Sequence, residues 1–86
     1  MPSTTLTPTG CNSLVWAAGH DWSHATAPIA AAGQTLVHTF VDKRVHDSYW
    51  TQSVGTPTRL GTPVTVRDTV PINDRWTLAA VEIVAS

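Results

Sequence analysis

The chain has 86 residues, a formal net charge of -1 and a hydrophobic fraction of 42%. This length fits one small domain, and the apolar content excludes a disordered chain. Only 13% of the residues are charged and no basic patch is present, so we expect no nucleic-acid partner. No apolar run approaches the roughly 20 residues of a membrane-spanning helix, so we expect no membrane partner either. Cys11 is the only cysteine, which excludes an internal disulfide and the paired-cysteine zinc modules.

Residues 1–12 are rich in Thr, Ser and Pro, a composition that is typical of an extended arm or linker. Residues 13–86 are then expected to form a single β domain. The opening MPSTTLTPTG has no basic region followed by an apolar one, so we do not expect it to be a signal peptide.

The first predicted strand is SLVWAAG, residues 13–19, a short apolar run that indicates burial on both faces. The following HDWSHATAPIAAAGQ is expected to be a loop with a short strand or helical turn, because Pro28 and Gly33 interrupt it.

Two strands joined by a charged hairpin connection are predicted next, over residues 35–42 and 48–54, because both are rich in β-branched and aromatic residues. Alternation places Leu36, His38 and Phe40 on one face of the first strand, and Trp50, Gln52 and Val54 on one face of the second.

The last two predicted strands cover residues 64–70 and 76–85. The first alternates cleanly, with Asp68 as the polar exception among Val64, Val66 and Val70. The second is nearly all apolar, so we expect it to be central in its sheet. About five short strands without a helix predict an all-β fold, a small antiparallel sandwich or half-sandwich.

The stretch GHDWSH, residues 19–24, suggests a metal site because it places His20 close to His24. Residues four apart on a strand are about 13 Å apart, too far to share an ion. A metal-dependent site would need this stretch to coil and a third ligand such as His38, His46 or Asp47. We therefore predict no metal ligands and no cofactor, and keep the His20/His24 site as a third alternative.

Catalytic patterns are weak, and we expect no enzyme. Ser23, Asp21 and His24 are too close in sequence to face one another on a strand, and the G-x-S-x-G turn is absent. Glu82 lies in an apolar strand, where we expect it to face outward and to pair with Arg67 or Arg75.

Four tryptophans are many for this length. Three lie in predicted strands and are expected in the core, since each buries a large area: these are Trp16, Trp50 and Trp76. Trp22 lies at a strand end, and Tyr49 and Trp50 point to opposite faces. Exposed aromatic rings beside polar groups suit a sugar, whose apolar face packs on the ring while its hydroxyls form hydrogen bonds. The candidate ligand-binding residues are Trp22, Tyr49, His20, Asp21 and His24.

Four blocks resemble, in order and spacing, the C-terminal half of an extracellular β-sandwich domain of large secreted bacterial, particularly actinobacterial, proteins. They are SLVWAAGHDW, GQTLVHTFVD, DSYWTQSV and VTVRDTVPINDRWTLAAVEI, within residues 13–84. Members of that family tend to carry Asn where His20 stands, so a ligand role for His20 would be peculiar to this chain. The family domain is longer, so this chain either folds into a smaller self-sufficient sandwich or barrel or is completed by another chain or a larger parent chain. The family supplies no catalytic residues.

The resemblance and the aromatic content together predict a non-enzymatic extracellular interaction module, with a glycan as the leading ligand. The alternative is a structural subunit that self-assembles into a homo-oligomer, filament or shell by strand pairing. The low charge favours that alternative, because weak net repulsion makes self-association easier.

Overall fold

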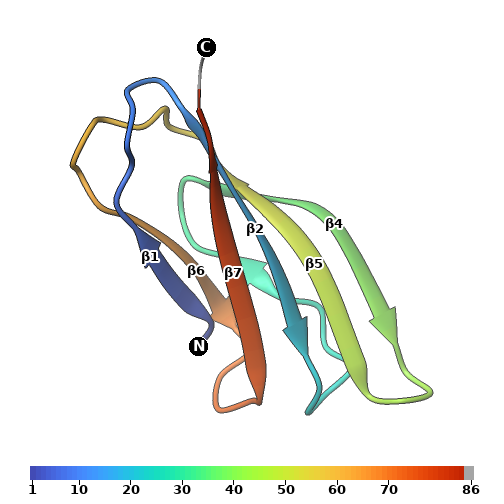
Figure 1. The fold of residues 1–86 in the computed structure, drawn as a ribbon. Coiled ribbons are helices and arrows are strands. Elements are labelled where there is room, and N and C mark those ends of the chain that lie inside the picture. Colours follow the sequence, from blue (N-terminus) through green and yellow to red (C-terminus); the bar gives the residue numbers. More distant parts are fainter. Residues whose placement is uncertain (85–86) are drawn as a thin grey trace.

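The computed structural model describes residues 1–84 and is all-β, as predicted. Two antiparallel sheets pack against each other as a small sandwich (Figure 1). The strands are β1 (Ser3–Leu6), β2 (Leu14–Asp21), β3 (Ile29–Ala30), β4 (Gln34–Asp42), β5 (Asp47–Val54), β6 (Val64–Val70) and β7 (Trp76–Ile83). The two strands beyond the predicted five are β1 and β3, which are too short to give a periodic signal. Residues 1–84 contain no helix that is long and apolar enough to cross a membrane.

The larger sheet has the strand order β4-β5-β2-β7, and the smaller sheet has the order β1-β6-β3. β2 is central and pairs with β7 along its whole length, from Leu14 opposite Ile83 to Asp21 opposite Trp76. The predicted central position of the last strand is wrong, because β7 lies at the edge of its sheet. Its apolar run has another cause: the side chains that point away from the smaller sheet are apolar as well.

The N-terminal segment belongs to the sandwich. β1 pairs with β6 in register, from Ser3 opposite Arg67 to Leu6 opposite Val64, and Pro2 is buried. Within the expected arm or linker, residues 1–12, Ser3–Leu6 therefore form an edge strand of the smaller sheet. Its Thr-rich composition suits an edge strand as well as a linker, so composition alone does not separate the two.

A β-bulge in β4 changes which side chains share a face. Leu36 lies opposite the buried Gln52, whereas His38 lies opposite Thr51, so the register shifts at the intervening Val37. Leu36 therefore points toward the smaller sheet while His38 and Phe40 point away from it. The predicted common face of these three residues is wrong for Leu36, because a bulge inserts one residue into the alternation.

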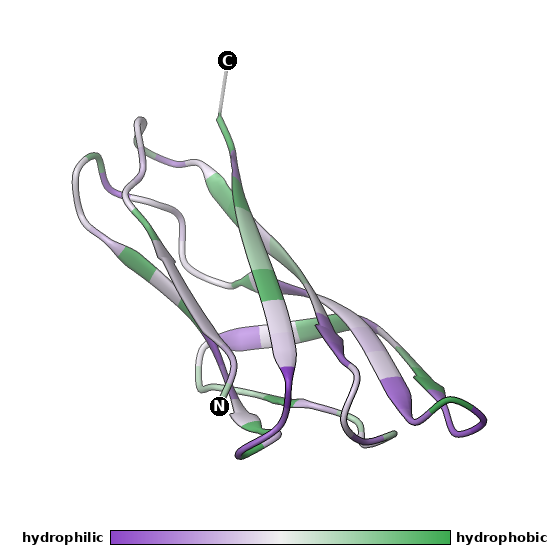
Figure 2. Cartoon of the chain, turned by 60° about the horizontal axis from the view of Figure 1, so that its bottom comes forward, coloured by the Kyte–Doolittle hydropathy of each residue, from purple (hydrophilic) through white to green (hydrophobic). Residues whose placement is uncertain are grey.

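The space between the sheets is apolar at one end and polar at the other. Val15, Ala17 and Val66 form a small buried cluster, against which Leu6, Val54, Val64, Leu78 and Ala80 pack. Toward the other end, the buried side chains include Asp21, Ser48, Trp50, Gln52 and Asp68. The strands become hydrophilic toward this end, where β2 ends and β5 begins (Figure 2).

Amide side chains of the larger sheet form hydrogen bonds with one another and with the backbone of the smaller sheet. The Trp50 indole N–H donates to Gln52 Oε1 at 2.9 Å, and Gln52 Nε2 donates to Gln34 Oε1 at 2.8 Å. Gln34 Oε1 also accepts the backbone N–H of Arg67 in β6, at 3.0 Å. The side-chain amides of Gln34 and Gln52 are thus hydrogen-bonded although they lie inside a small domain with a limited apolar core.

Of the three tryptophans expected in the core, only Trp50 is buried; Trp16 and Trp76 are half-buried. Trp16 alternates with Val15 and Ala17, which point inward, so its side chain lies on the other side of the sheet.

Candidate functional site

The candidate site lies at one end of the larger sheet. There β2 ends and β5 begins, and the β2–β3 loop, the β4–β5 hairpin and the β6–β7 loop lie together at the bottom of Figure 1. Cross-strand pairing sets Phe40 opposite Tyr49, and Tyr49 opposite His20. Side chains on one face of neighbouring strands contact one another at such positions.

His20 stacks on Tyr49. Their ring centroids are 4.3 Å apart and the ring planes differ by 8°. Asp47 Oδ2 bonds to both side chains: it accepts the Tyr49 hydroxyl at 3.0 Å and lies 3.1 Å from His20 Nε2. The hydrogen bond to Asp47 raises the pKa of Tyr49 above its usual range. The shared carboxylate fixes the orientation of both rings.

Two further aromatic rings flank this stack. The Trp22 ring centroid lies 5.4 Å from that of His20, and the Phe40 centroid lies 6.4 Å from that of Tyr49. Trp22 is 40% exposed, Tyr49 is 41% exposed and Phe40 is 54% exposed. The structure thus brings Trp22 and Tyr49 together at the surface, on either side of His20. We call the following five residues the aromatic cluster: Trp22, His20, Tyr49, Phe40 and Asp47.

Asp21 is fully buried, so it does not offer its carboxyl to a ligand. Its Oδ1 accepts the backbone N–H groups of Ser23 and His24, at 2.8 and 3.3 Å. This local pattern, common for Asp at turns, holds the loop that carries Trp22. Burial, together with the neighbouring Asp74 carboxyl, raises the pKa of Asp21. We therefore conclude that Asp21 stabilises the loop that carries Trp22 and does not contact a ligand itself.

The β6–β7 loop is tied to the loop that carries Trp22. Trp22 N–H donates to the Arg75 carbonyl at 3.1 Å, and Arg75 N–H donates to Ser23 Oγ at 2.8 Å. His24 Nδ1 lies 2.8 Å from Asp74 Oδ1. The pKa of Asp74 is lowered, first by the Asp21 carboxyl and then by His24. These contacts fix the backbone on both sides of Trp22.

The two histidines do not converge. His20 lies in β2 and bonds to Asp47, whereas His24 lies in the loop and bonds to Asp74. No group of three His, Cys, Asp or Glu side chains within residues 1–84 is placed to hold a metal ion. The arrangement that the metal alternative requires is therefore not present in this part of the chain.

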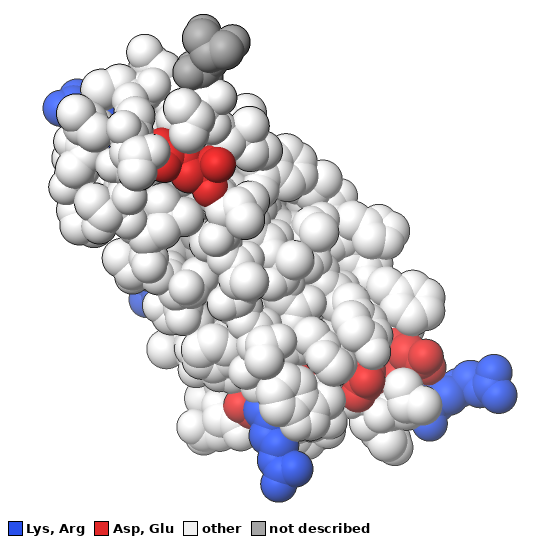
Figure 3. All heavy atoms as spheres, in the orientation of Figure 1, with Lys and Arg blue, Asp and Glu red and all other residues white. Residues whose placement is uncertain are grey.

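Charged side chains gather at the two ends of the sandwich, and the face between them is nearly uncharged (Figure 3). The end with the aromatic cluster carries Asp42, Lys43, Arg44, Asp47, Asp74 and Arg75. Cations and carboxylates are interspersed there, so this end has no strong field of one sign.

Sequence reasoning missed Phe40 and the bridging role of Asp47. Alternation places Phe40 on a strand face without identifying its partner, and nothing in the sequence pattern pairs Asp47 with His20 or Tyr49. The hairpin register places both beside Tyr49. Alternation reports the face on which a side chain lies but not its cross-strand partner, which here depends on the hairpin closing between Asp42 and Asp47.

Comparisons with protein family models, with curated proteins and with solved structures find no match to this chain.

Proposed function

We propose that this protein is a non-enzymatic, extracellular carbohydrate-binding module whose ligand is a neutral glycan that binds at the aromatic cluster. The observation that carries this proposal is that Trp22 and Tyr49 are both exposed and both contact His20. A sugar ring binds well to a solvent-exposed aromatic side chain that has hydrogen-bonding groups beside it, because the ring covers its apolar face and the polar groups bind its hydroxyls.

The sugar packs on Trp22 rather than on Tyr49. One face of the Tyr49 ring is covered by His20, at 4.3 Å and nearly parallel, so this ring has no free face on that side. Trp22 belongs to a loop whose backbone is held by Asp21 and Arg75. A ring held in place loses little conformational entropy on binding, which favours affinity.

Hydroxyl groups of the sugar bond to Asp47 and to the Tyr49 hydroxyl. The Asp47 side chain is 17% exposed, and a carboxylate has about four acceptor positions, of which its two neighbours use two. A neutral glycan fits best, because charges of both signs surround the cluster and favour neither an anionic nor a cationic ligand.

Binding to a panel of cellulose, chitin, starch, xylan and their soluble oligosaccharides tests this proposal. We expect the parent protein to bind at least one of them and Trp22→Ala to weaken that binding by about five- to thirtyfold, since a stacked ring contributes about 1–2 kcal/mol. Trp22→Phe, which keeps a flat ring, should retain part of the affinity.

Leu60→Ala is the matched control, because Leu60 is an exposed apolar residue in the β5–β6 loop, away from the cluster. It should leave the affinity unchanged. Absence of binding to the whole panel, or equal binding by Trp22→Ala, would refute the proposal.

A further inference from the structure

We propose that the carboxyl groups of Asp21 and Asp74 share one proton, and that this proton holds the β2–β3 loop, which carries Trp22, against the β6–β7 loop. The order of the β2–β3 loop then depends on pH, because the loop is held only while the proton is bound. The consequence for glycan binding rests on the proposed function, whereas the carboxyl pair itself does not.

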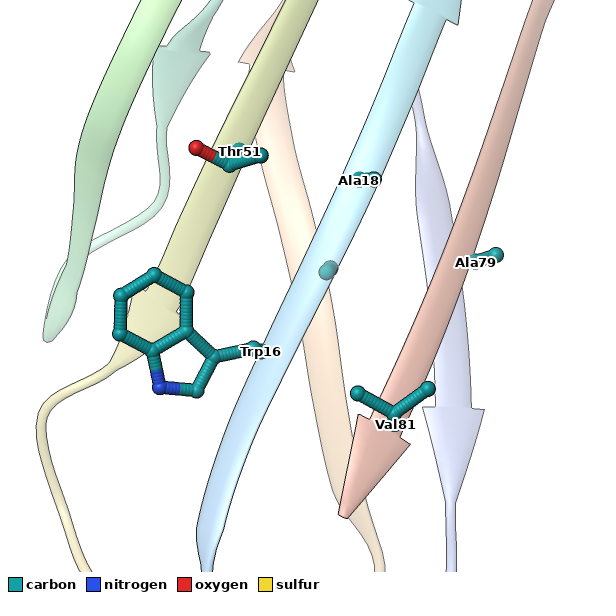
Figure 4. A pocket seen from close by; sticks show the side chains of 6 residues that line it. Trp16, Ala18, Thr51, Ala79 and Val81 are labelled. Carbon is teal, nitrogen blue, oxygen red and sulfur yellow. The ribbon is translucent and has the colours of Figure 1, made fainter. Parts of the chain in front are cut away.

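The buried titratable group of this pair lies at the end of β2. In its middle, β2 lines a hollow of about 250 Å³ together with β5 and β7 (Figure 4). The lining residues include Trp16, Ala18 and Val81, and none of them is titratable, so the hollow does not respond to pH. Asp21 ends the same strand and is fully buried, directly before Trp22.

Asp21 has one carboxyl oxygen without a donor. Oδ1 accepts the backbone N–H groups of Ser23 and His24, at 2.8 and 3.3 Å. Oδ2 is buried and receives no hydrogen bond from the residues that the structure describes. A buried carboxylate oxygen in that position is costly, so the group binds a proton instead, which turns Oδ2 from an acceptor into a donor.

The Asp74 carboxyl in the β6–β7 loop accepts this proton. Its side chain is only 11% exposed and forms a hydrogen bond with the Asp21 carboxyl. Burial, and then the hydrogen bond to Asp74, raises the pKa of Asp21, while the same hydrogen bond lowers the pKa of Asp74. Opposite directions within one pair mean that Asp21 holds the proton and Asp74 accepts it.

Two basic groups keep Asp74 in its charged form. His24 Nδ1 lies 2.8 Å from Asp74 Oδ1. The N-terminal amine of Met1 also lowers the pKa of Asp74. Each attraction favours the carboxylate that accepts the proton from Asp21.

The strands beside Asp21 add no charge that acts on it. β5 places Ser48 opposite Asp21, and β7 places Trp76 there. β6 carries the buried Asp68, which does not contribute to the pKa of Asp21. Within residues 1–84, Asp74 is therefore the charged group that acts on Asp21.

Loss of the shared proton separates the two loops. Above the raised pKa of Asp21, two neighbouring carboxylates are charged and repel each other, and one of them is fully buried. The separation also breaks the hydrogen bonds from Trp22 N–H to the Arg75 carbonyl and from Arg75 N–H to Ser23 Oγ.

The sign of the pH dependence follows from the two pKa directions. The folded state keeps on Asp21 a proton that the unfolded chain has released, so this stabilisation is lost as the pH rises through the raised pKa of Asp21. The lowered pKa of Asp74 sets the acid limit, below which the accepting charge is lost.

A carbon-13 NMR titration of the aspartate carboxyl carbons in the parent protein, from about pH 2 to about pH 8, tests the pair without any variant. We expect Asp21 to titrate above the usual range of aspartate and Asp74 below it. The heteronuclear NOE of the Trp22 and Ser23 amides should fall as the pH rises through the Asp21 titration. An Asp21 that titrates at or below the usual value overturns the proposal, as does a loop whose order does not change with pH.

Asp21→Asn should keep Trp22 ordered at every pH above the Asp74 titration, because its amide donates to Asp74 without a titrating proton. Any response caused by His24 remains in this variant, so the difference from the parent protein reports Asp21 alone. Asp42→Asn is the matched control, because Asp42 Oδ1 also accepts a backbone N–H two residues ahead, that of Arg44 at 3.0 Å. This control should behave as the parent protein does, and an Asp21→Asn protein that loses order as the parent does overturns the proposal.

The affinity for the panel polysaccharide that the parent protein binds should fall over the same pH range, and Asp21→Asn should not show this fall. Absence of binding to the whole panel would refute the glycan proposal and leave the NMR result standing. A loop that stays ordered at all pH values would refute the carboxyl pair and leave glycan binding at Trp22 standing.

Discussion

Gly19 determines how Trp50 lies inside the sandwich. The two residues are opposite one another in β2 and β5. A Cβ atom at position 19 would lie 2.3 Å from two indole carbons of Trp50, closer than any real contact. The indole therefore covers the glycine backbone, and from there its N–H reaches Gln52 at 2.9 Å. One missing side chain thus allows both the burial of Trp50 and its hydrogen bond.

Gly19→Ala should destabilise the protein by about 1–3 kcal/mol, the usual cost of overpacking, because the indole must turn away or the strand must shift. Chemical denaturation followed by tryptophan fluorescence measures the change.

Gly10→Ala is the matched control for that substitution, since a Cβ there meets its nearest atom, Ser13 Oγ, at 3.4 Å. If Gly19→Ala were as stable as the parent protein, the burial of the Trp50 indole would not depend on the missing side chain at position 19.

At the scale of elements, the C-terminal part of β7 fastens the N-terminal segment. Glu82 Oε1 accepts the backbone N–H and the hydroxyl of Thr9, at 2.8 and 3.0 Å, and Oε2 accepts Gly10 N–H at 3.2 Å. The expected pairing of Glu82 with Arg67 or Arg75 is wrong. The backbone N–H of Thr9, with smaller help from Ser13, lowers the pKa of Glu82.

Glu82→Gln should increase the amide hydrogen exchange of Thr9 and Gly10, because a neutral amide oxygen is a weaker acceptor than a carboxylate. Exchange measured by NMR at neutral pH checks this.

Asp42→Asn makes the same chemical change in the β4–β5 hairpin, where Asp42 Oδ1 accepts Arg44 N–H. This substitution should leave the amide hydrogen exchange rates of Thr9 and Gly10 the same as in the parent protein. Unchanged exchange at Thr9 in Glu82→Gln would mean that other contacts hold the segment.

At the scale of the whole molecule, the unusual feature is a carboxyl group between the two sheets. Asp68 in β6 is fully buried, and its oxygens have no hydrogen-bond partner within residues 1–84. Burial raises the pKa of Asp68 to about 6, although the neighbouring polar groups of Trp50 and Gln52 oppose this rise. The folded state therefore binds a proton that the unfolded chain releases near pH 4.

The stability of the parent protein should fall as the pH rises from about 4 to about 6 because of this group, by at most about 3 kcal/mol. Asp68→Asn has no such titration and should be the more stable protein at pH 7. The difference in unfolding free energy between the two proteins, from urea denaturation between pH 4 and pH 7, isolates Asp68 from Asp21, Asp74 and Glu82. A difference that does not vary with pH would contradict the prediction.

The sequence by itself determined the fold class and most strand positions. Alternation alone located β6 at Val64–Val70 and β5 to within one residue. It also placed Trp50 and Gln52 on one inward face, because side chains of a strand alternate strictly. For the site, it singled out Trp22 and Tyr49 as candidate ligand-binding residues, but whether they are exposed was decided by the structure, in which they are 40% and 41% exposed.

Only the tertiary structure decided which of these residues meet. The stacking of His20 on Tyr49 depends on the pairing of β2 with β5, which are separated in the chain by β3 and β4. The edge position of β7 and the inclusion of β1 in the smaller sheet likewise depend on strand order. Local sequence reports the period of a strand and its apolar content. Pairing between distant strands is set by the total burial and hydrogen bonding of the whole sandwich, which no single segment contains.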